Sequence, residues 1–256
     1  MKTEKLKERL LAHTLENELR LTDNGELAHN DGQHTTLRPV PELTLDDKVI
    51  EHVNRVVVLN DDNIRELTNA PKNTTFYGTL NISEDVLSRA ENVGLRLTPE
   101  SYIDGEVGMD SDGFLDVPNI SASDTIGECA GKVIAPYAST KKSIGALNHG
   151  DVIANGATAE NYIGLWSLGD VIANHAKARI IGYENRADVI ANGATAETIG
   201  YINLGDVIAN GATAENYIGE FNRGDVIANH AKARIIGLEN RGDVEANGAT
   251  AKYIGD

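Results

Sequence analysis

A column of regularly spaced aspartates is the feature of this chain that most suggests chemistry. It recurs at intervals of eighteen or nineteen positions and consists of Asp151, Asp170, Asp188, Asp206, Asp225 and Asp243. A row of carboxylates could hold Ca²⁺, which takes about six to eight oxygen ligands. Each interval supplies one aspartate, whereas the calcium-binding nonapeptide pattern places one in both halves of a coil. We therefore interpret the column as aspartates that cap turns.

Histidine and cysteine are the other residues that could bind a metal or act as a nucleophile. His175 and His230 lie three intervals apart, about 14 Å at the spacing of stacked strands, so they cannot share one ion. His29 and His34 lie in a polar stretch, where a metal site is an alternative to a plain loop. Cys129, the single cysteine, has no recognisable base partner and is expected to be a small buried thiol. The sequence thus offers no catalytic, cofactor-binding or metal-binding residue, and implies no cofactor.

Two further patterns resemble binding motifs. The integrin tripeptide occurs at Arg223–Asp225 and again at Arg241–Asp243, but Leu-Gly-Asp and His-Gly-Asp fill the same place elsewhere, as expected of a turn. A threonine row could bind ice, but lysine interrupts it twice; its members are Thr158, Lys177, Thr195, Thr213, Lys232 and Thr250. We interpret both patterns as outer positions of a repeat.

The repeat itself reads DVIANGATAENYIG from Asp151 and restarts at each aspartate of the column. A period of about 18 residues is too short for a pair of helices and is typical of a solenoid. Apolar residues alternate within it, at Val152, Ala154, Ala157, Ala159 and Ile163, which is the strand period. The sequence therefore predicts a mainly β parallel β-helix in which these five columns point inward. We count about eight coils, with a degenerate one starting near Asp116.

The outer columns of the repeat predict how neighbouring coils hold their register. One column alternates in charge, at Glu160, Arg179, Glu197, Glu215, Arg234 and Lys252. Another is an amide column that predicts a stacked ladder, at Asn155, Asn174, Asn192, Asn210, Asn229 and Asn247. A third is isoleucine at 153, 172, 190, 208 and 227, then Glu245, and is either core or a docking face. At the level of whole coils, residues 151–200 match 206–255 at 41 of 50 positions, which indicates a duplicated three-coil block.

The chain before the solenoid follows other patterns. Leucines at helical spacing predict an amphipathic helix over residues 3–20, and a polar loop follows over 22–33. A short helix capped by Asp46, a strand over 55–59 and a helix over 83–93 are expected next. We therefore divide the chain into residues 1–44, an α/β segment 45–111 that caps the solenoid, and the β-helix 112–256.

Segments within residues 45–95 resemble a known family. They read LDDKVI from Leu45, NTT followed by GTL from Asn73, and IS followed by GL from Ile82. Together with the coil Gly211–Ile227, they resemble the carboxy-terminal domain of the large subunit of glutamate synthase, whose right-handed β-helix is named GXGXG for its glycines. A related helix forms a subunit of formylmethanofuran dehydrogenase. Departures are single glycines where the family has pairs, and His175 and His230 at two glycine positions.

The resemblance implies a scaffold, since this domain holds catalytic domains apart and carries no catalytic residue. It implies a structural subunit of a cytosolic, glutamate-synthase-like oxidoreductase complex, with a flavoprotein or amidotransferase subunit as partner. The alternative is a stand-alone solenoid that binds proteins or forms a homo-oligomer. An enzyme in its own right, such as a sugar lyase, is a third reading; a hexapeptide acyltransferase is disfavoured because the longer coils break its period.

Composition limits the partners. The net charge of −16 disfavours nucleic acid as a ligand, although an acidic solenoid could mimic DNA. The chain has no leader-like apolar segment and no apolar run approaching the length of a membrane-spanning helix, so we expect neither secretion nor membrane insertion. A single cysteine suits the cytoplasm.

Overall fold

The computed structural model describes residues 19–21, 26–30, 35–39, 55–68, 70, 74–88, 93–109, 113–128 and 131–255. They belong to two compact units, Met1–Val58 and Leu59–Asp256. The first contains a three-stranded antiparallel sheet of β1 (Leu19–Leu21), β2 (Glu26–Asn30) and β3 (Thr35–Pro39). The loop predicted over 22–33 is therefore wrong in part, because β2 lies within it. Most of the predicted helix 3–20, and the helix capped by Asp46, lie outside the described residues.

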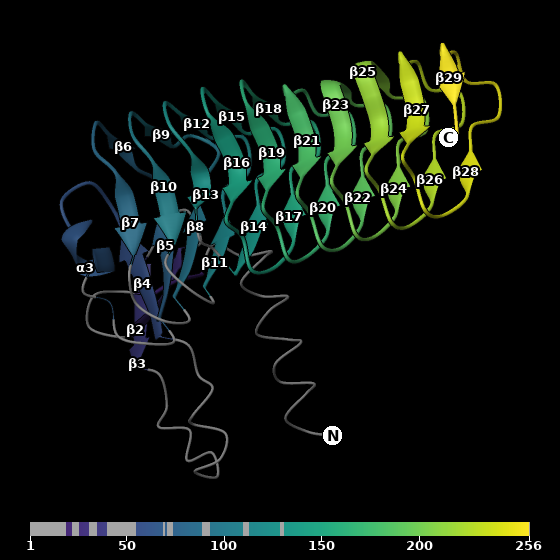
Figure 1. Ribbon diagram of the computed structural model, residues 1–256. Helices are drawn as coiled ribbons and strands as arrows, with labels where there is room; N and C mark the ends of the chain where they lie inside the picture. The colour runs from purple at the N-terminus through teal and green to yellow at the C-terminus, as the bar shows by residue number, and fades with distance from the viewer. Residues whose placement is uncertain are drawn as a thin grey trace, which may run out of the picture. The chain divides into compact units, whose positions relative to one another are not determined.

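The second unit is a parallel β-solenoid of about ten turns, which confirms the predicted fold class (Figure 1). Its largest sheet has 11 strands and, from β5 onward, adds one strand per coil. The strands are β4 (Arg55–Leu59), β5 (Thr74–Gly78), β8 (Gly94–Leu97), β11 (Phe114–Asp116), β14 (Lys132–Ile134), β17 (Val152–Ile153), β20 (Val171–Ile172), β22 (Val189–Ile190), β24 (Val207–Ile208), β26 (Val226–Ile227) and β28 (Val244–Glu245). We call this the Val-Ile sheet; β4 confirms the strand predicted over 55–59.

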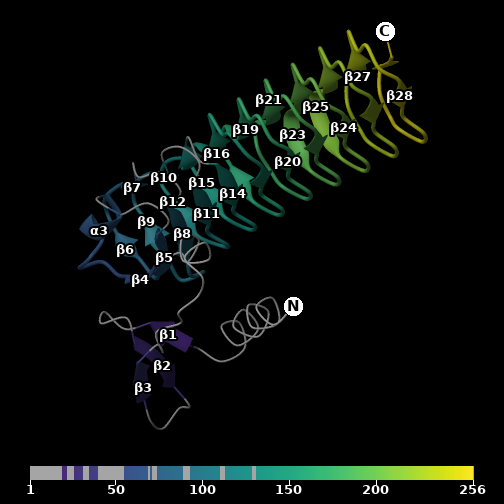
Figure 2. The same ribbon diagram turned by 90° about the horizontal axis from the view of Figure 1, so that it is seen from below.

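A second sheet runs along another side of the coils and has ten strands. They are β7 (Val86–Ser88), β10 (Val107–Met109), β13 (Ile126–Glu128), β16 (Ser143–Ala146), β19 (Tyr162–Leu165), β21 (Ile180–Tyr183), β23 (Thr195–Tyr201), β25 (Thr213–Glu220), β27 (Ile235–Leu238) and β29 (Tyr253–Ile254). We call it the Ile-Gly sheet. The coils follow one another along the stack from β5 to β28 (Figure 2).

A third, five-stranded sheet completes the amino-terminal coils. It contains β6 (Asn81–Ile82), β9 (Tyr102–Ile103), β12 (Ser121–Ala122), β15 (Ser139–Thr140) and β18 (Thr158–Ala159). Parallel bridges continue the same column, from Thr158 to Lys177 to Thr195 and from Thr213 to Lys232 to Thr250. The threonine row is therefore a strand column of the solenoid. The only helix among the described residues is the single turn α3 (Arg65–Thr68).

The coils begin earlier than the sequence suggested. β5 to β10 already pair in parallel with the strands that follow them, so the solenoid includes residues from Thr74 and has more than the eight coils expected. The helix predicted over 83–93 is wrong, because Val86–Ser88 forms β7 with Val86 and Ser88 buried and the residue between them exposed. The degenerate coil expected near Asp116 is present and begins two residues earlier, because Phe114 pairs with Lys132 and Asp116 with Ile134.

The five inward columns are as predicted. Val152, Ala154, Ala157 and Ile163 are fully buried, and Ala159 is 3% exposed. Small alanines let opposite walls of a coil approach closely, and each apolar side chain stacks on its equivalent about 4.8 Å away. The amino-terminal coils hold larger side chains in the Val152 column, namely Phe76, Leu95 and Leu115, all nearly fully buried.

Candidate protein-interaction surface

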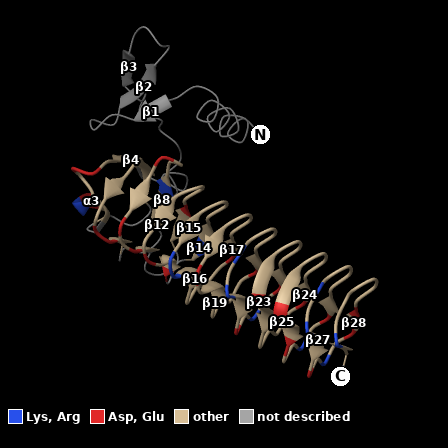
Figure 3. Cartoon of the chain, turned by 90° about the horizontal axis from the view of Figure 1, so that it is seen from above, with Lys and Arg blue, Asp and Glu red and all other residues tan. Residues whose placement is uncertain are grey.

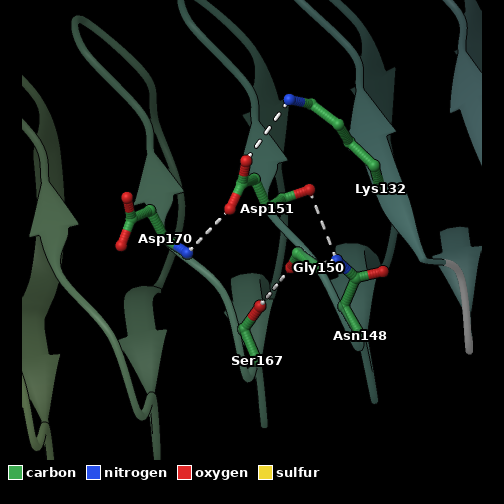
Figure 4. A network of polar contacts seen from close by, with 6 residues as sticks. All are labelled: Lys132, Asn148, Gly150, Asp151, Ser167 and Asp170. Atoms are coloured by element: carbon green, nitrogen blue, oxygen red, sulfur yellow. Dashed lines mark hydrogen bonds and ion pairs between the residues drawn. The ribbon is translucent and has the colours of Figure 1, made fainter.

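The aspartate column is a hydrogen-bond ladder. The backbone N–H of Asp170 donates to Oδ1 of Asp151 at 3.2 Å, and the four later steps have distances of 3.1, 2.8, 2.8 and 2.8 Å. Figure 4 shows the first step, where Lys132 Nζ also lies 3.3 Å from Oδ2 of Asp151. The aspartates were predicted to cap turns; instead, each carboxylate from Asp151 to Asp225 accepts the N–H of the equivalent aspartate in the next coil. Across the described part of the chain, no three His, Cys, Asp or Glu side chains gather where they could hold a metal ion.

The two repeat histidines are turn residues, as expected. His175 and His230 have φ values of 57° and 58°, the left-handed conformation that glycine takes at the equivalent position of other coils. The His175 ring lies over Gly193 of the next coil, where an added Cβ would be 2.5 Å from Nδ1. His29 lies in β2, and His34 and Cys129 lie outside the described residues.

The asparagine column forms the predicted ladder. Each backbone N–H from Asn174 to Asn247 donates to Oδ1 of the asparagine in the preceding coil, at 2.8–3.0 Å. In the last coil Glu245 Oε1 accepts from Nδ2 of Asn229 at 2.9 Å and of Asn247 at 3.0 Å. Glu245 is therefore a ladder partner as well as a break in the isoleucine column.

The isoleucine column lies on the outer side of the Val-Ile sheet. Val189 and Val207 are fully buried, whereas Ile190 and Ile208 are half-buried on the opposite face and pair in register. Of the two readings, the column is thus a partly exposed face and not core. In the charge column, the described residues contain one ion pair, Arg179 Nε to Glu197 Oε2 at 3.5 Å. Acidic and basic residues are interspersed along the stack (Figure 3).

A larger apolar surface lies at the corner that leads from the Ile-Gly sheet to the Val-Ile sheet, and the sequence reasoning missed it. We call it the corner stripe. It consists of Leu147, Trp166, Leu168, Ile202, Leu204 and Phe221, which are 39, 46, 45, 38, 42 and 38% exposed. Such side chains are normally scattered over a surface; here they gather on one corner in two groups, on either side of the coil that carries Glu184 and Arg186, and so form a candidate interaction site.

Buried amides fix the shape of this corner. Asn203 is fully buried and its Nδ2 donates to the carbonyl of Gly205 at 2.7 Å, and Asn148, Asn185 and Asn222 make the same contact in their own coils. In the one coil with Ser167 at this place, its hydroxyl donates to Gly150 O at 3.3 Å (Figure 4). Because this residue points inward, the residue on either side of it points outward. The pairs Trp166 with Leu168 and Ile202 with Leu204 therefore project from the same corner.

The backbone at the corner is in a conformation that suits glycine better. Leu147, Trp166, Ile202 and Phe221 have φ values of 52–53°. A non-glycine residue in this region costs about 1–2 kcal/mol, and β-branched Ile202 is the least suited. Large side chains are kept there despite the strain and despite being exposed. Glu184 and Glu239 take the same conformation in their coils, with φ values of 52° and 49°, so the strain is a property of the corner itself.

Aromatic stacking extends the surface along the coils. Ring centroids of Tyr162 and Tyr183 are 5.8 Å apart, those of Tyr183 and Tyr201 are 5.1 Å apart with 16° between planes, and those of Tyr201 and Phe221 are 5.9 Å apart. Contacts of this kind contribute about 0.5–1.5 kcal/mol each. Since the ring faces of Tyr183 and Tyr201 cover each other, the edges face outward, which suits protein packing better than stacking of flat ligands.

One signal in the sequence does point to the corner. The two three-coil blocks differ at nine of 50 positions, and six of these lie at the corner, at residues 165–168, 183 and 187 and their counterparts 220–223, 238 and 242. The five apolar interior columns of the blocks are unchanged. The duplicated coils therefore kept their core and varied the surface that they present here.

A second cluster lies on the outer side of the first coils of the Ile-Gly sheet. Burial and a hydrogen bond with Glu128 raise the pKa of Glu106 to about 8, and the carboxylates of Asp124 and Asp85 add to the shift. Lys142 Nζ lies 2.6 Å from Asp124 Oδ2, which lowers the pKa of Asp124. Glu106 and Glu128 thus form an acid pair, next to one compensated carboxylate. Sequence reasoning missed this pair because the two residues belong to different coils.

Comparison with protein-family models, with curated proteins and with solved structures found no match. In the part of the chain that the structure describes, no helix has the length and apolar character needed to cross a membrane.

Proposed function

We propose that this chain is a structural scaffold, a β-solenoid subunit or domain that binds other polypeptides and does no chemistry of its own. The observation that carries this proposal is the corner stripe, six exposed apolar side chains, four of them at strained backbone positions, on a regular stack of coils. Solenoids use such extended surfaces for protein binding. The strain is understandable if the exposed side chains become buried against a second polypeptide.

The resemblance to the GXGXG domain of glutamate synthase supplies the context. It rests on segments in residues 45–95 and on the coil Gly211–Ile227. On this basis the scaffold belongs to a cytosolic, glutamate-synthase-like enzyme complex, and its partner there is a flavoprotein or an amidotransferase subunit. The alternative is a scaffold unconnected to an enzyme. Self-complementarity of the stripe favours this alternative, because a second copy of the chain could then cover it.

The test uses the tagged full chain, returned to its native cells and purified under gentle conditions. We expect a flavoprotein or a glutaminase-type subunit to copurify with the wild-type chain but not with the double variant Ile202→Glu and Leu204→Glu. A control carries Lys177→Glu and Lys232→Glu, exposed positions on another side of the coils. Recovery of the same subunits with all three proteins would show that the stripe is not the binding surface. Recovery of no such subunit with any of them would remove the enzyme complex from the proposal.

A further inference from the structure

The outward residues of the corner come in pairs whose chemistry changes from coil to coil. Each pair flanks the inward asparagine or serine of its coil. Along the stack the pairs are Leu147 and His149, Trp166 and Leu168, Glu184 and Arg186, Ile202 and Leu204, Phe221 and Arg223, and Glu239 and Arg241. Two of the pairs are wholly apolar, and in both the second member is Leu. In the two pairs that begin with Glu, the second member is Arg.

The charged members of these pairs have no ionic partner within the solenoid. Among the described residues, Glu184, Glu239, Arg186, Arg223 and Arg241 form no ion pair within 4.0 Å, although each Glu is only two residues from an Arg. Three free arginines in a chain of net charge −16 are notable, since acidic side chains are abundant around them. Burial, and after it the neighbouring Glu239 carboxylate, raise the pKa of Glu220. We call the column with Glu184 and Glu239 the acidic margin, and the column with Arg186, Arg223 and Arg241 the basic margin. Neither margin has a partner of opposite charge within the described solenoid.

We propose that the corner stripe binds the corner stripe of a second copy of this chain, with the two solenoids side by side and their coils running in the same direction. The inference rests on the alternative form of the proposed function, a scaffold whose stripe complements itself, because it names the polypeptide that covers the stripe. It commits to one arrangement, in which a two-fold axis lies parallel to the solenoid axis. This rotation brings the first member of every pair opposite the second member of the same pair in the other copy.

Five of the six coil levels are complementary in this arrangement, the exception being that of Leu147 and His149. Glu184 meets Arg186 of the second copy, and Glu239 meets its Arg241, each contact occurring twice by symmetry. Trp166 meets Leu168, Ile202 meets Leu204, and Phe221 lies opposite Arg223, where a cation can pack on the ring face. The levels stay in step along the interface because both copies have coils about 4.8 Å apart.

The opposite arrangement is much poorer. A two-fold axis perpendicular to the stack leaves each column facing itself and reverses the order of the coils. With the axis at the level of Ile202, Arg186 would face Arg223 and Trp166 would face Glu239. Like charges and an unpaired carboxylate against an indole both disfavour this interface.

The size of the surface sets the expected strength. The exposed parts of the six stripe residues sum to an area on the order of 500 Å², below the roughly 800 Å² per partner of a standard interface. Two copies of net charge −16 also repel each other. We therefore expect a weak, reversible dimer.

Reversed charges provide the test. One variant, Glu184→Arg with Glu239→Arg, makes both margins basic; another, Arg186→Glu with Arg241→Glu, makes both margins acidic. We expect each alone to dimerise at least about tenfold more weakly than wild type in sedimentation equilibrium. Mixed in equal amounts they should form a heterodimer of at least wild-type affinity, identified by native mass spectrometry. Trp166, the single tryptophan, should shift its emission to shorter wavelength as the dimer forms.

A matched control carries Lys177→Glu and Lys232→Glu, which change the same two coils and the same net charge as the acidic variant, on another side. It should dimerise like wild type, and circular dichroism should show all variants folded. A wild-type chain that stays monomeric at 500 μM, or a mixture that fails to associate, would overturn the inference. If dimerisation fails but the stripe variants no longer copurify the subunits that the wild-type chain binds in native cells, the proposed scaffold function stands and a different protein covers the stripe.

Discussion

Gly164 and Val171 are packed so closely that a Cβ atom on Gly164 would lie 2.3 Å from Cγ2 of Val171 in the following coil. Gly164 also has a φ of 71°. The same contact recurs between glycine and valine all along the solenoid, for example at 2.4 Å between Gly219 and Val226. This column therefore fixes the distance between the Ile-Gly sheet and the Val-Ile sheet.

Replacing Gly164 by alanine should lower the free energy of unfolding by about 2–4 kcal/mol, through overpacking and the strained φ together. The matched control is Gly211→Ala, because Gly211 has a φ of 65° and no atom within 4 Å of an added Cβ. It should cost about 1 kcal/mol, from the backbone alone. Urea denaturation of both variants measures the difference, and equal costs would show that the valine contact can relax.

The acid pair predicts a pH-dependent stability. Glu106 keeps its proton up to about pH 8 in the folded chain, whereas a free glutamate releases it near pH 4.5. The native state thus binds more protons than the unfolded state between these values, so stability should fall as pH rises from about 5 to 8. Glu106→Gln should flatten this dependence in urea denaturation series. The control Glu84→Gln, at an exposed position of the preceding coil, should leave the slope of stability against pH unchanged. If Glu106→Gln also has the wild-type slope, Glu106 is not its source.

The two faces of the Val-Ile sheet should respond differently to a charge. Ile190→Glu with Ile208→Glu places carboxylates on the outer face, where Glu245 already occupies the same column. The variant should keep its β-sheet circular dichroism at a cost of about 1–2 kcal/mol. Val189→Glu with Val207→Glu buries two carboxylates among fully enclosed side chains and should prevent folding. If the isoleucine variant also unfolds, its column is packed more tightly than its half-exposed state indicates.

The charge column should contribute little. Arg179 and Glu197 are each about half exposed and 3.5 Å apart. Arg179→Glu replaces this pair by a run of acids from Glu160 to Glu215, so we expect a loss of about 0.5–1 kcal/mol at low salt, reduced in 0.5 M salt. Thermal melts of the variant and of the wild-type chain at both salt concentrations test this expectation. If the two proteins have the same melting temperature at low salt, the column does not contribute to stability.

The alternation of apolar residues was enough to predict the coil interior, because strand side chains alternate strictly between faces. It was not enough to find the first coils. Leu95 and Leu115 replace the valine of later coils there, and the short strand at Val86 has apolar spacing that also fits a helix. The corner stripe was harder still. Ile202 contradicts local preference, since a β-branched residue rarely takes a positive φ, and its exposure follows from an inward asparagine beside it. Predicting the acid pair would have required the register between neighbouring coils. The irregular repeat spacing over residues 94–128 does not reveal that register.

The aspartate ladder has a direction, and this bears on how the chain folds. Each carboxylate from Asp151 to Asp225 accepts an N–H from the coil that follows it, so a coil already in place offers an acceptor to the next one. The amino-terminal coils have the largest buried side chains and are the best candidates for a nucleus. We expect folding to proceed vectorially from them, in the order in which a ribosome delivers the chain. Pulsed hydrogen exchange during refolding should then protect the amide of Leu115 before that of Val226, and the reverse order would exclude this pathway.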